Sequence, residues 1–363
     1  MKKQTTIVNN NKIIAPHQPN PVTGKEGLFT YNKPFGLESG AVFTNLHLAY
    51  TTYGQMNAAG DNVIWIFHAL TANSQPHEWW PQMLGEGKVF DPEKDFIICV
   101  NMPGSCYGSI SPLDENPATG QPYYHSFPFF TTRDMIRSYM LLRKELGIHK
   151  IKIGIGGSMG GQQLLEWAIE EPGLFDAIIP MATNAFHSAW GKAFNASQRF
   201  AIEADDTWQQ QHANAGKKGM EVARSIGLLS YRNATAYNKT QSETTDEKLQ
   251  NFKSESYQRY QGTKLSARFN AFSYYVLSKG MDAHNVGRGR GSVTSALAQI
   301  KARTLVLSLE GDILFPPDEQ EFLAAHIPGA QLRFIRSDYG HDGFLLEFQQ
   351  ISAAIKEFDN LAM

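Results

Sequence analysis

Cysteine is scarce in this sequence, and Cys99 and Cys106 are the only two among 363 residues. Two cysteines are too few to build a disulfide framework in a chain of this length, and their spacing matches no metal-binding motif. We therefore expect a protein of a reducing compartment with no bound metal ion.

Long hydrophobic runs are also missing. No stretch of about 18 apolar residues occurs, the length that a membrane-spanning helix needs. Residues 1–17 begin with two lysines after the first methionine, as a secretion signal can, but three asparagines interrupt the apolar stretch that such a signal requires. We expect a cytoplasmic protein with no membrane partner.

Neither sign of charge dominates the chain. Lys and Arg number 33 and Asp and Glu number 35, so the chain lacks the positive excess that neutralises the phosphates of nucleic acids. A hydrophobic content of 42% with 19% charged residues is typical of a globular protein. The length suits one large domain with an insertion, or two domains.

From residue 63 onward, short apolar runs rich in β-branched residues alternate with amphipathic segments. The runs VIWIF and FIICV predict buried strands, and the full set of expected strands is 63–67, 96–100, 151–155, 177–181, 304–309 and 332–335. Helices are expected at 132–146, 162–169, 318–326 and after Gly343. This alternation predicts an α/β fold with a mostly parallel central sheet.

The pattern changes between residues 183 and 295, which are polar, helical in period and without a convincing strand. We interpret this stretch as an inserted helical lid subdomain. The predicted organisation is therefore a first part of the core (1–182), the lid (183–295) and a second part of the core (296–363). Within the lid, residues 238–253 are almost wholly polar and predict an exposed helix or loop.

The sequence Gly156-Gly157-Ser158-Met159-Gly160 fits the pattern G-x-S-x-G between an expected strand and an expected helix. In the α/β-hydrolase fold this pattern forms a sharp turn that exposes a nucleophilic serine. Glycine neighbours leave room where the chain passes close to itself, and the helix N-terminus favours a developing oxyanion. We predict Ser158 as a nucleophile, although a glycine-rich turn of this kind can also bind phosphate.

A serine nucleophile needs a histidine base, and the histidine needs an acid. In this fold the three follow each other in the order Ser, acid, His. Asp312 follows the strand expected at 304–309, and His341 follows the last expected strand, so we predict them as acid and base. The rival acids fit less well, because Glu310 lies within the strand pattern and Asp318 is expected to cap the next helix.

The loop after the first expected strand offers a further functional group. The backbone N–H groups of Leu70 in this loop and of Met159 after the serine are the predicted oxyanion hole. His68 in the same loop is expected to be a hydrogen-bonded structural residue. Cys106 is expected to be a turn residue rather than a nucleophile.

Several longer motifs together resemble the homoserine O-acyltransferases, a family with the α/β-hydrolase fold. They are HALT (68–71), NPATGQPY (116–123), TTRDM (131–135), GGSMGGQQLLEWA (156–168), FPPDEQ (315–320) and GHDGFLLE (340–347). The resemblance, which covers the chain from about residue 30, implies transfer of an acyl group to L-homoserine in methionine biosynthesis. It implies acetyl-CoA as co-substrate, no cofactor, and a homodimer formed through the lid. With Ser158 and His341 as nucleophile and base, we expect a ping-pong mechanism through an acyl-enzyme.

The resemblance also implies three residues that hold the acceptor. Arg224 and Tyr231 match an arginine and a tyrosine of the family's lid, and Asp342 matches an acidic residue beside the histidine. Residues seven apart lie on one face of a helix, so Arg224 and Tyr231 can point together into a cleft. Arg224 would bind the carboxylate of a zwitterion and Asp342 its amino group. Judged without the resemblance, Arg224 and Asp342 would instead be expected in surface ion pairs.

Three stretches depart from the family pattern near the expected acyl pocket. Ala72 follows HALT where the family usually has glycine, and residues 103–112 and 311–315 also differ. These differences leave acetyl versus succinyl donor and homoserine versus serine acceptor open. Two further hypotheses are a serine esterase that uses the same three residues and a non-catalytic protein that keeps the fold.

Overall fold

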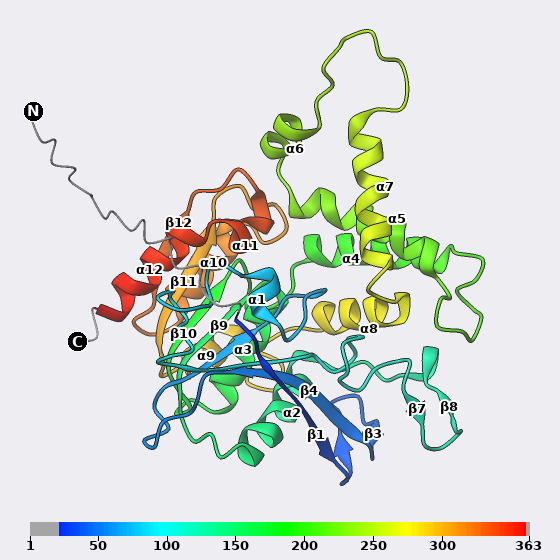
Figure 1. The fold of residues 1–363 in the computed structure, drawn as a ribbon. Coiled ribbons are helices and arrows are strands. Elements are labelled where there is room, and N and C mark those ends of the chain that lie inside the picture. Colours follow the sequence, from blue (N-terminus) through cyan, green and yellow to red (C-terminus); the bar gives the residue numbers. More distant parts are fainter. Residues whose placement is uncertain (1–21, 361–363) are drawn as a thin grey trace, which may run out of the picture.

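The computed structural model describes residues 22–360, and an eight-stranded sheet lies at its centre (Figure 1). The strand order is β1-β4-β6-β5-β9-β10-β11-β12. All neighbours from β6 to β12 pair in parallel, whereas β4 is antiparallel to both β1 and β6. The predicted mostly parallel sheet is therefore confirmed. Its strands are β1 (Lys25–Tyr31), β4 (Leu46–Tyr53), β5 (Val63–Phe67), β6 (Phe96–Val100), β9 (Ile151–Gly157), β10 (Phe175–Met181), β11 (Arg303–Leu309) and β12 (Gln331–Ile335).

Strands β1 and β4 lie outside the predicted set. Along both strands the side chains differ in exposure, and β1 forms an edge of the sheet with most of its residues exposed. Such strands contain polar residues and give no continuous apolar run. Four two-residue strands were also not predicted from the sequence: β2 (Phe35–Gly36), β3 (Val42–Phe43), β7 (Glu115–Asn116) and β8 (Gln121–Pro122).

The central strands are apolar along their whole length because helices cover both faces of the sheet. Every residue of β5 is buried, and its alternate side chains enter two separate clusters. Trp65 packs edge-on against Trp167 of α3 on one face, and Ile64 and Ile66 join Ile351 of α12 on the other. Helices α2 (Thr132–Glu145), α3 (Met159–Glu170), α9 (Val293–Leu297) and α10 (Pro317–His326) contribute to the first cluster, and α12 (Phe348–Asn360) to the second.

The local signals at helix ends are mostly as expected. Thr131 caps α2 in a reciprocal pair with Asp134, and Gly147 follows the helix with a φ of 67° that suits glycine. The prediction that Asp318 caps a helix was wrong. Helix α10 begins at Pro317, whose ring already sets a helical φ, and no side chain caps it. Glu310 also lies just after β11 rather than within it.

Residues between β10 and β11 form a group of helices on one side of the sheet, as Figure 1 shows. Within the described residues 183–295 no strand occurs, only a single bridge between Phe186 and Asn285. The loop between α6 and α7 extends away from the core, and residues 238–253 are mostly exposed, as predicted. The helices are α4 (Ala189–Glu203), α5 (Lys217–Tyr231), α6 (Ala234–Gln241), α7 (Lys253–Ser266) and α8 (Ala271–Asp282). The division of the chain into core and lid at 182/183 and 295/296 stays a prediction. Helix α9 (Val293–Leu297) crosses the second of these boundaries.

Candidate active site

Ser158 lies on a sharp turn between β9 and α3. Its φ of 57° and ψ of −128° are strained for a residue with a side chain. Two hydrogen bonds hold the turn: the Ser158 N–H donates to the Met181 carbonyl (3.0 Å), and the Thr183 hydroxyl donates to the Ser158 carbonyl (2.8 Å). The strand and helix predicted on either side of Ser158 are confirmed, although α3 begins three residues earlier than expected.

Close backbone contacts explain the glycines around Ser158. A Cβ atom on Gly160 would lie 2.2 Å from the Phe67 carbonyl oxygen, and one on Gly156 would lie 2.6 Å from the Gly160 carbonyl carbon. Both distances are far below van der Waals contact, and the atoms involved are backbone atoms that cannot rotate away. The turn therefore requires glycine at both positions.

Asp312 and His341 form a buried hydrogen-bonded pair at the ends of β11 and β12. One carboxylate oxygen of Asp312 accepts the Leu314 and Phe315 N–H groups at 2.9 Å each, and the other lies 2.7 Å from His341 Nδ1. His341 lies in the short 3-10 helix η2 (Gly340–Asp342), and its ring stacks on Phe315 at 5.0 Å. Because Nδ1 faces the carboxylate, Nε2 is the nitrogen left to take up a proton.

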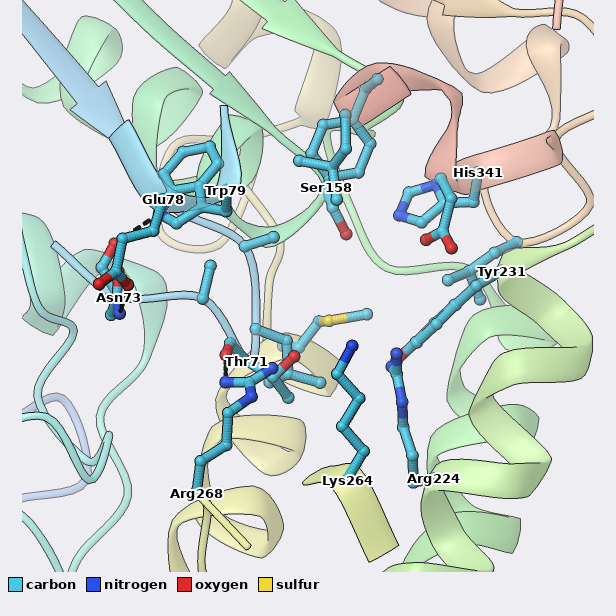
Figure 2. A pocket seen from close by; sticks show the side chains of 18 of the residues that line it. Thr71, Asn73, Glu78, Trp79, Ser158, Arg224, Tyr231, Lys264, Arg268 and His341 are labelled. Atoms are coloured by element: carbon cyan, nitrogen blue, oxygen red, sulfur yellow. Dashed lines mark hydrogen bonds between the residues drawn. The ribbon is translucent and has the colours of Figure 1, made fainter. Parts of the chain in front are cut away.

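Ser158 and His341 line one cavity with a volume of about 430 Å³. Figure 2 shows the hydroxyl and the imidazole directed toward the same space from neighbouring turns. No hydrogen bond joins them within residues 22–360. In free active sites this bond is often long and shortens when substrate binds. The structure thus brings the three predicted catalytic residues together without a complete chain of hydrogen bonds.

The two predicted oxyanion donors are available for a ligand. Leu70 lines the cavity, and Met159 is the first residue of α3, where helix N–H groups have no partner within the helix. Among the hydrogen bonds of residues 22–360, neither the Leu70 nor the Met159 N–H donates to a protein atom. Both amides therefore remain candidates for holding a negative oxygen.

His68 and Cys106 are structural residues, as predicted. The buried His68 ring bonds the Ala69 carbonyl through Nδ1 (2.9 Å) and accepts the Met102 N–H at Nε2 (3.1 Å). Burial lowers the pKa of His68 to about 4, so the ring is neutral near pH 7. Burial raises the pKa of Cys106 to about 11, which keeps this turn residue in its less nucleophilic thiol form.

The lid supplies Arg224 and Tyr231 to the same cavity. Both belong to α5, and the Arg224 guanidinium carbon lies 5.2 Å from the centre of the Tyr231 ring. The expectation that they share one helix face and point into a cleft is confirmed. Arg224 forms no ion pair with any residue of 22–360, so the alternative of a surface ion pair does not apply to it.

Asp342 also lines the cavity, next to His341. Its carboxylate lies 2.9 Å from Arg232 Nε, although that N–H is not directed at the oxygen. Burial raises the pKa of Asp342, while Arg232 and Arg224 oppose the rise. For Asp342 the ion-pair alternative is therefore partly correct, because Arg232 is its partner.

Two cations on the cavity wall were not singled out from the sequence. Lys264 lies on α7 and Arg268 shortly after its end, and both line the cavity. Arg268 Nη1 donates to the Thr71 carbonyl (2.6 Å) and to the Tyr107 hydroxyl. No local signal could have identified them, since a basic residue on a polar helix is usually a solvated one.

Within residues 22–360, no helix is long and apolar enough to cross a bilayer. The same residues contain no group of three or more His, Cys, Asp or Glu side chains arranged to hold a metal ion.

Comparisons with known proteins agree with this fold. The family model described as alpha/beta hydrolase fold matches residues 62–348. The homoserine O-acetyltransferase of Cyclobacterium marinum is 48% identical over 344 residues, which cover 95% of this chain and 97% of that protein.

Two solved structures extend the comparison. The homoserine O-acetyltransferase of Staphylococcus aureus superimposes with a TM-score of 0.77 at 28% identity, covering 94% of this chain and 96% of that one. An acetylester hydrolase of Corynebacterium glutamicum superimposes with a TM-score of 0.81 at 25% identity, covering 92% and 96%. The sequence identity to the curated relative, together with the fold, shows that this chain belongs to the homoserine O-acetyltransferase family, acyltransferases built on the α/β-hydrolase fold.

Proposed function

We propose that this protein transfers an acetyl group from acetyl-CoA to the hydroxyl of L-homoserine, a step of methionine biosynthesis, through an acyl-enzyme on Ser158. One observation carries the proposal. His341, which Asp312 holds at 2.7 Å, lines a cavity together with Ser158, Arg224 and Asp342. A nucleophile with its base thus shares one space with a cation and an anion suited to an amino acid.

In the first half of the reaction, Ser158 is acylated. Its oxygen attacks the thioester carbonyl carbon while His341 Nε2 takes its proton, and the Leu70 and Met159 amides stabilise the oxyanion. The C–S bond then breaks, the sulfur receives the proton from His341, and CoA leaves. Asp312 keeps the imidazole in the required tautomer and stabilises its protonated form.

In the second half, the homoserine hydroxyl replaces CoA. His341 takes the hydroxyl proton as the oxygen attacks the acetyl carbon, and the same two amides hold the second oxyanion. The bond to the Ser158 oxygen breaks, and Ser158 recovers its proton from His341. The products are O-acetylhomoserine and the free enzyme.

The lid distinguishes an amino-acid acceptor from water. Arg224 is placed to bind the acceptor carboxylate in a two-pronged contact, and Asp342 to accept the ammonium group. Tyr231 closes the cavity beside Arg224. An ammonium near Asp342 would also favour its ionised form, against the effect of burial. Positioning the acceptor and excluding solvent favour transfer over hydrolysis.

A donor-by-acceptor activity matrix tests the proposal. Purified protein is incubated with acetyl-CoA or succinyl-CoA, each with homoserine, serine or no acceptor, and free CoA is measured. We expect the fastest CoA release with acetyl-CoA and homoserine, and little release without acceptor. Acceptor-independent release of CoA would instead indicate hydrolysis. Faster CoA release with succinyl-CoA would change the assigned donor, and faster release with serine would change the assigned acceptor. The mechanism would stay the same in both cases.

Hydrolysis of esters is the second candidate function, because an acetylester hydrolase shares the fold over 92% of this chain. In that reaction water would take the place of homoserine at the acyl-enzyme. An arylacetate substrate separates the two, since a transferase should divert its acetyl group to added homoserine. Failure of Ser158 to react with a fluorophosphonate would support a non-catalytic protein instead.

We further propose a cytoplasmic homodimer that forms through the lid. Large apolar side chains on α4 and α5 are exposed, namely Trp190, Phe200, Val222 and Leu229. Exposed apolar groups on two packed helices support a protein contact there. Sedimentation should give twice the chain mass, and Leu229→Asp should lower it toward the monomer. A monomeric wild type at micromolar concentration would contradict the dimer.

A further inference from the structure

Lys264 and Arg268 approach the catalytic cavity from α7 and the turn that follows it. Lys264 lies in the last turn of α7, and Arg268 follows two residues after the helix ends. Both line the cavity together with Ser158 and Arg224. Figure 2 shows the Lys264 side chain between those of Arg268 and Arg224, with its nitrogen directed into the space.

The cavity has more positive charge than an amino-acid acceptor requires. Three cations line it, Arg224, Lys264 and Arg268, against two acids, Glu78 and Asp342. Glu78 accepts the Asn73 amide and Asp342 lies beside Arg232. A zwitterion is neutral overall, and Arg224 with Asp342 already matches its two charges. Lys264 and Arg268 are then cations for which the acceptor provides no partner.

Neither of these cations is neutralised by the protein. Among residues 22–360, no carboxylate oxygen lies within 4.0 Å of Lys264 Nζ or of the Arg268 guanidinium. Arg268 uses only Nη1 for its bonds to Thr71 and Tyr107. Its Nε and Nη2 groups therefore keep donors for a ligand. Both residues are exposed, so their charges remain hydrated until an anion arrives.

Acetyl-CoA, the proposed donor, has the net negative charge that the amino-acid acceptor lacks. Coenzyme A carries a pyrophosphate and a 3′-phosphate, and its thiol end must reach Ser158 in this cavity. Arginine binds phosphate oxygens in a forked contact, and lysine attracts them as a compact charge. We propose that Lys264 and Arg268 form the phosphate-binding site for the CoA part of the donor. This inference rests on the proposed acyl transfer from acetyl-CoA.

Lys264 allows the sharper test, because it makes no contact that holds the catalytic loops. Lys264→Ala and Lys264→Glu are assayed with acetyl-CoA and with S-acetylpantetheine, which has the same thioester but no phosphate. We expect kcat/KM for acetyl-CoA to fall about threefold for Ala and about tenfold for Glu, because exposed charge pairs contribute modestly and reversal adds repulsion. With S-acetylpantetheine both variants should match the wild type.

Lys239→Glu is the matched control. Lys239 is exposed on α6, outside the cavity, and its reversal changes the net charge by the same amount. It should leave both donors unaffected. High salt should lower the wild-type kcat/KM for acetyl-CoA and have less effect on Lys264→Glu, since salt screens exposed charges.

An equal loss with both donors would overturn the inference, because Lys264 would then act on the acceptor or on the fold. No loss with acetyl-CoA would overturn it as well. Both results leave wild-type transfer to homoserine intact, so the proposed function would survive. A wild type that cannot use acetyl-CoA would overturn the proposed function and this inference with it.

Discussion

The two walls of the cavity differ in how firmly the protein holds their side chains. On the sheet wall, Ser158, Asp312 and His341 have 5%, 3% and 4% of their surfaces exposed, and backbone groups fix Ser158 and Asp312. On the lid wall, Arg224 and Lys264 have no ion-pair partner within residues 22–360. The difference indicates a division of labour. Bond making needs groups that are positioned in advance, whereas charged substrates are bound by groups that the protein leaves unpaired.

The largest effect should follow from removing the nucleophile on the sheet wall. Ser158→Ala should lower acyl transfer by at least about 10⁴-fold, because no other group can form the acyl-enzyme. CoA release with acetyl-CoA and homoserine is the measurement, and an unchanged melting temperature shows that the fold is intact. Residual activity above about 1% would remove Ser158 from the mechanism.

The next largest effect should come from Asp312→Asn. The amide can still accept the Leu314 and Phe315 N–H groups, but it presents the wrong partner to His341 Nδ1 and favours the wrong tautomer. We expect kcat to fall about 10³- to 10⁴-fold with little change in KM. Glu310→Gln is the control, since Glu310 is the rival acid nearest in sequence and should lose less than twofold in kcat. Equal losses in both variants would reject Asp312 as the acid.

The sheet wall could be predicted from the sequence because its residues follow strands that are recognisable as apolar runs. Ser158, Asp312 and His341 each come just after β9, β11 or β12, and parallel strands bring their carboxyl ends to one edge. The lid wall could not be predicted in this way. Arg224 and Tyr231 emerged only through a family resemblance.

Contacts between distant segments explain the remaining misses. Lys264 and Arg268 reach the cavity only through the way α7 packs on α5, which no local pattern encodes. Arg268 bonds Thr71, which is 197 positions away in the chain. Strands β1 and β4 were not predicted because each has positions that are not fully buried, and their sequences are therefore mixed in polarity.

On the lid wall, Arg224→Ala should separate acceptor binding from chemistry. We expect kcat/KM for homoserine to fall about 10²-fold, because the acceptor carboxylate loses its charged partner. The rate of acyl-enzyme formation, followed in a single turnover without acceptor, should stay within about twofold. Arg224→Lys should recover part of the loss through its charge. A matching loss in acyl-enzyme formation would contradict a role limited to the acceptor.

Two buried histidines at the base of the lid predict a pH effect on stability. Burial, followed by Lys192, lowers the pKa of His187 to about 3, and burial lowers that of His284 to about 3. Both are therefore neutral in the folded protein but become charged in the unfolded chain below about pH 6.5. Their contribution to stability is complete above that pH and is lost as the pH falls toward 3.

Urea unfolding measures this effect. Between pH 7 and pH 5.5 each histidine should reduce the free energy of unfolding by roughly 1 kcal/mol. His284→Asn, which keeps a donor for the Asn184 carbonyl, should show a correspondingly smaller pH dependence. An unchanged slope in the variant would exclude His284 as a source of the effect.

Among the losses of kcat or kcat/KM predicted for the residues of the two walls, the smallest comes from Arg268, which connects the walls. Its guanidinium holds the carbonyl of Thr71, the residue after the predicted oxyanion donor Leu70. Arg268→Ala should therefore lower kcat about tenfold with both acetyl-CoA and S-acetylpantetheine, since loosening this loop weakens oxyanion stabilisation for any donor. Its kcat/KM should fall further with acetyl-CoA alone, because only that donor also loses a phosphate contact. Arg268→Lys, which can still donate one hydrogen bond, should recover part of kcat. Lys264→Ala should show no such loss with the phosphate-free donor. If Arg268→Ala lowered activity only with acetyl-CoA, Arg268 would act only in binding the donor. The Leu70 loop would then keep its position without the hydrogen bond from Arg268.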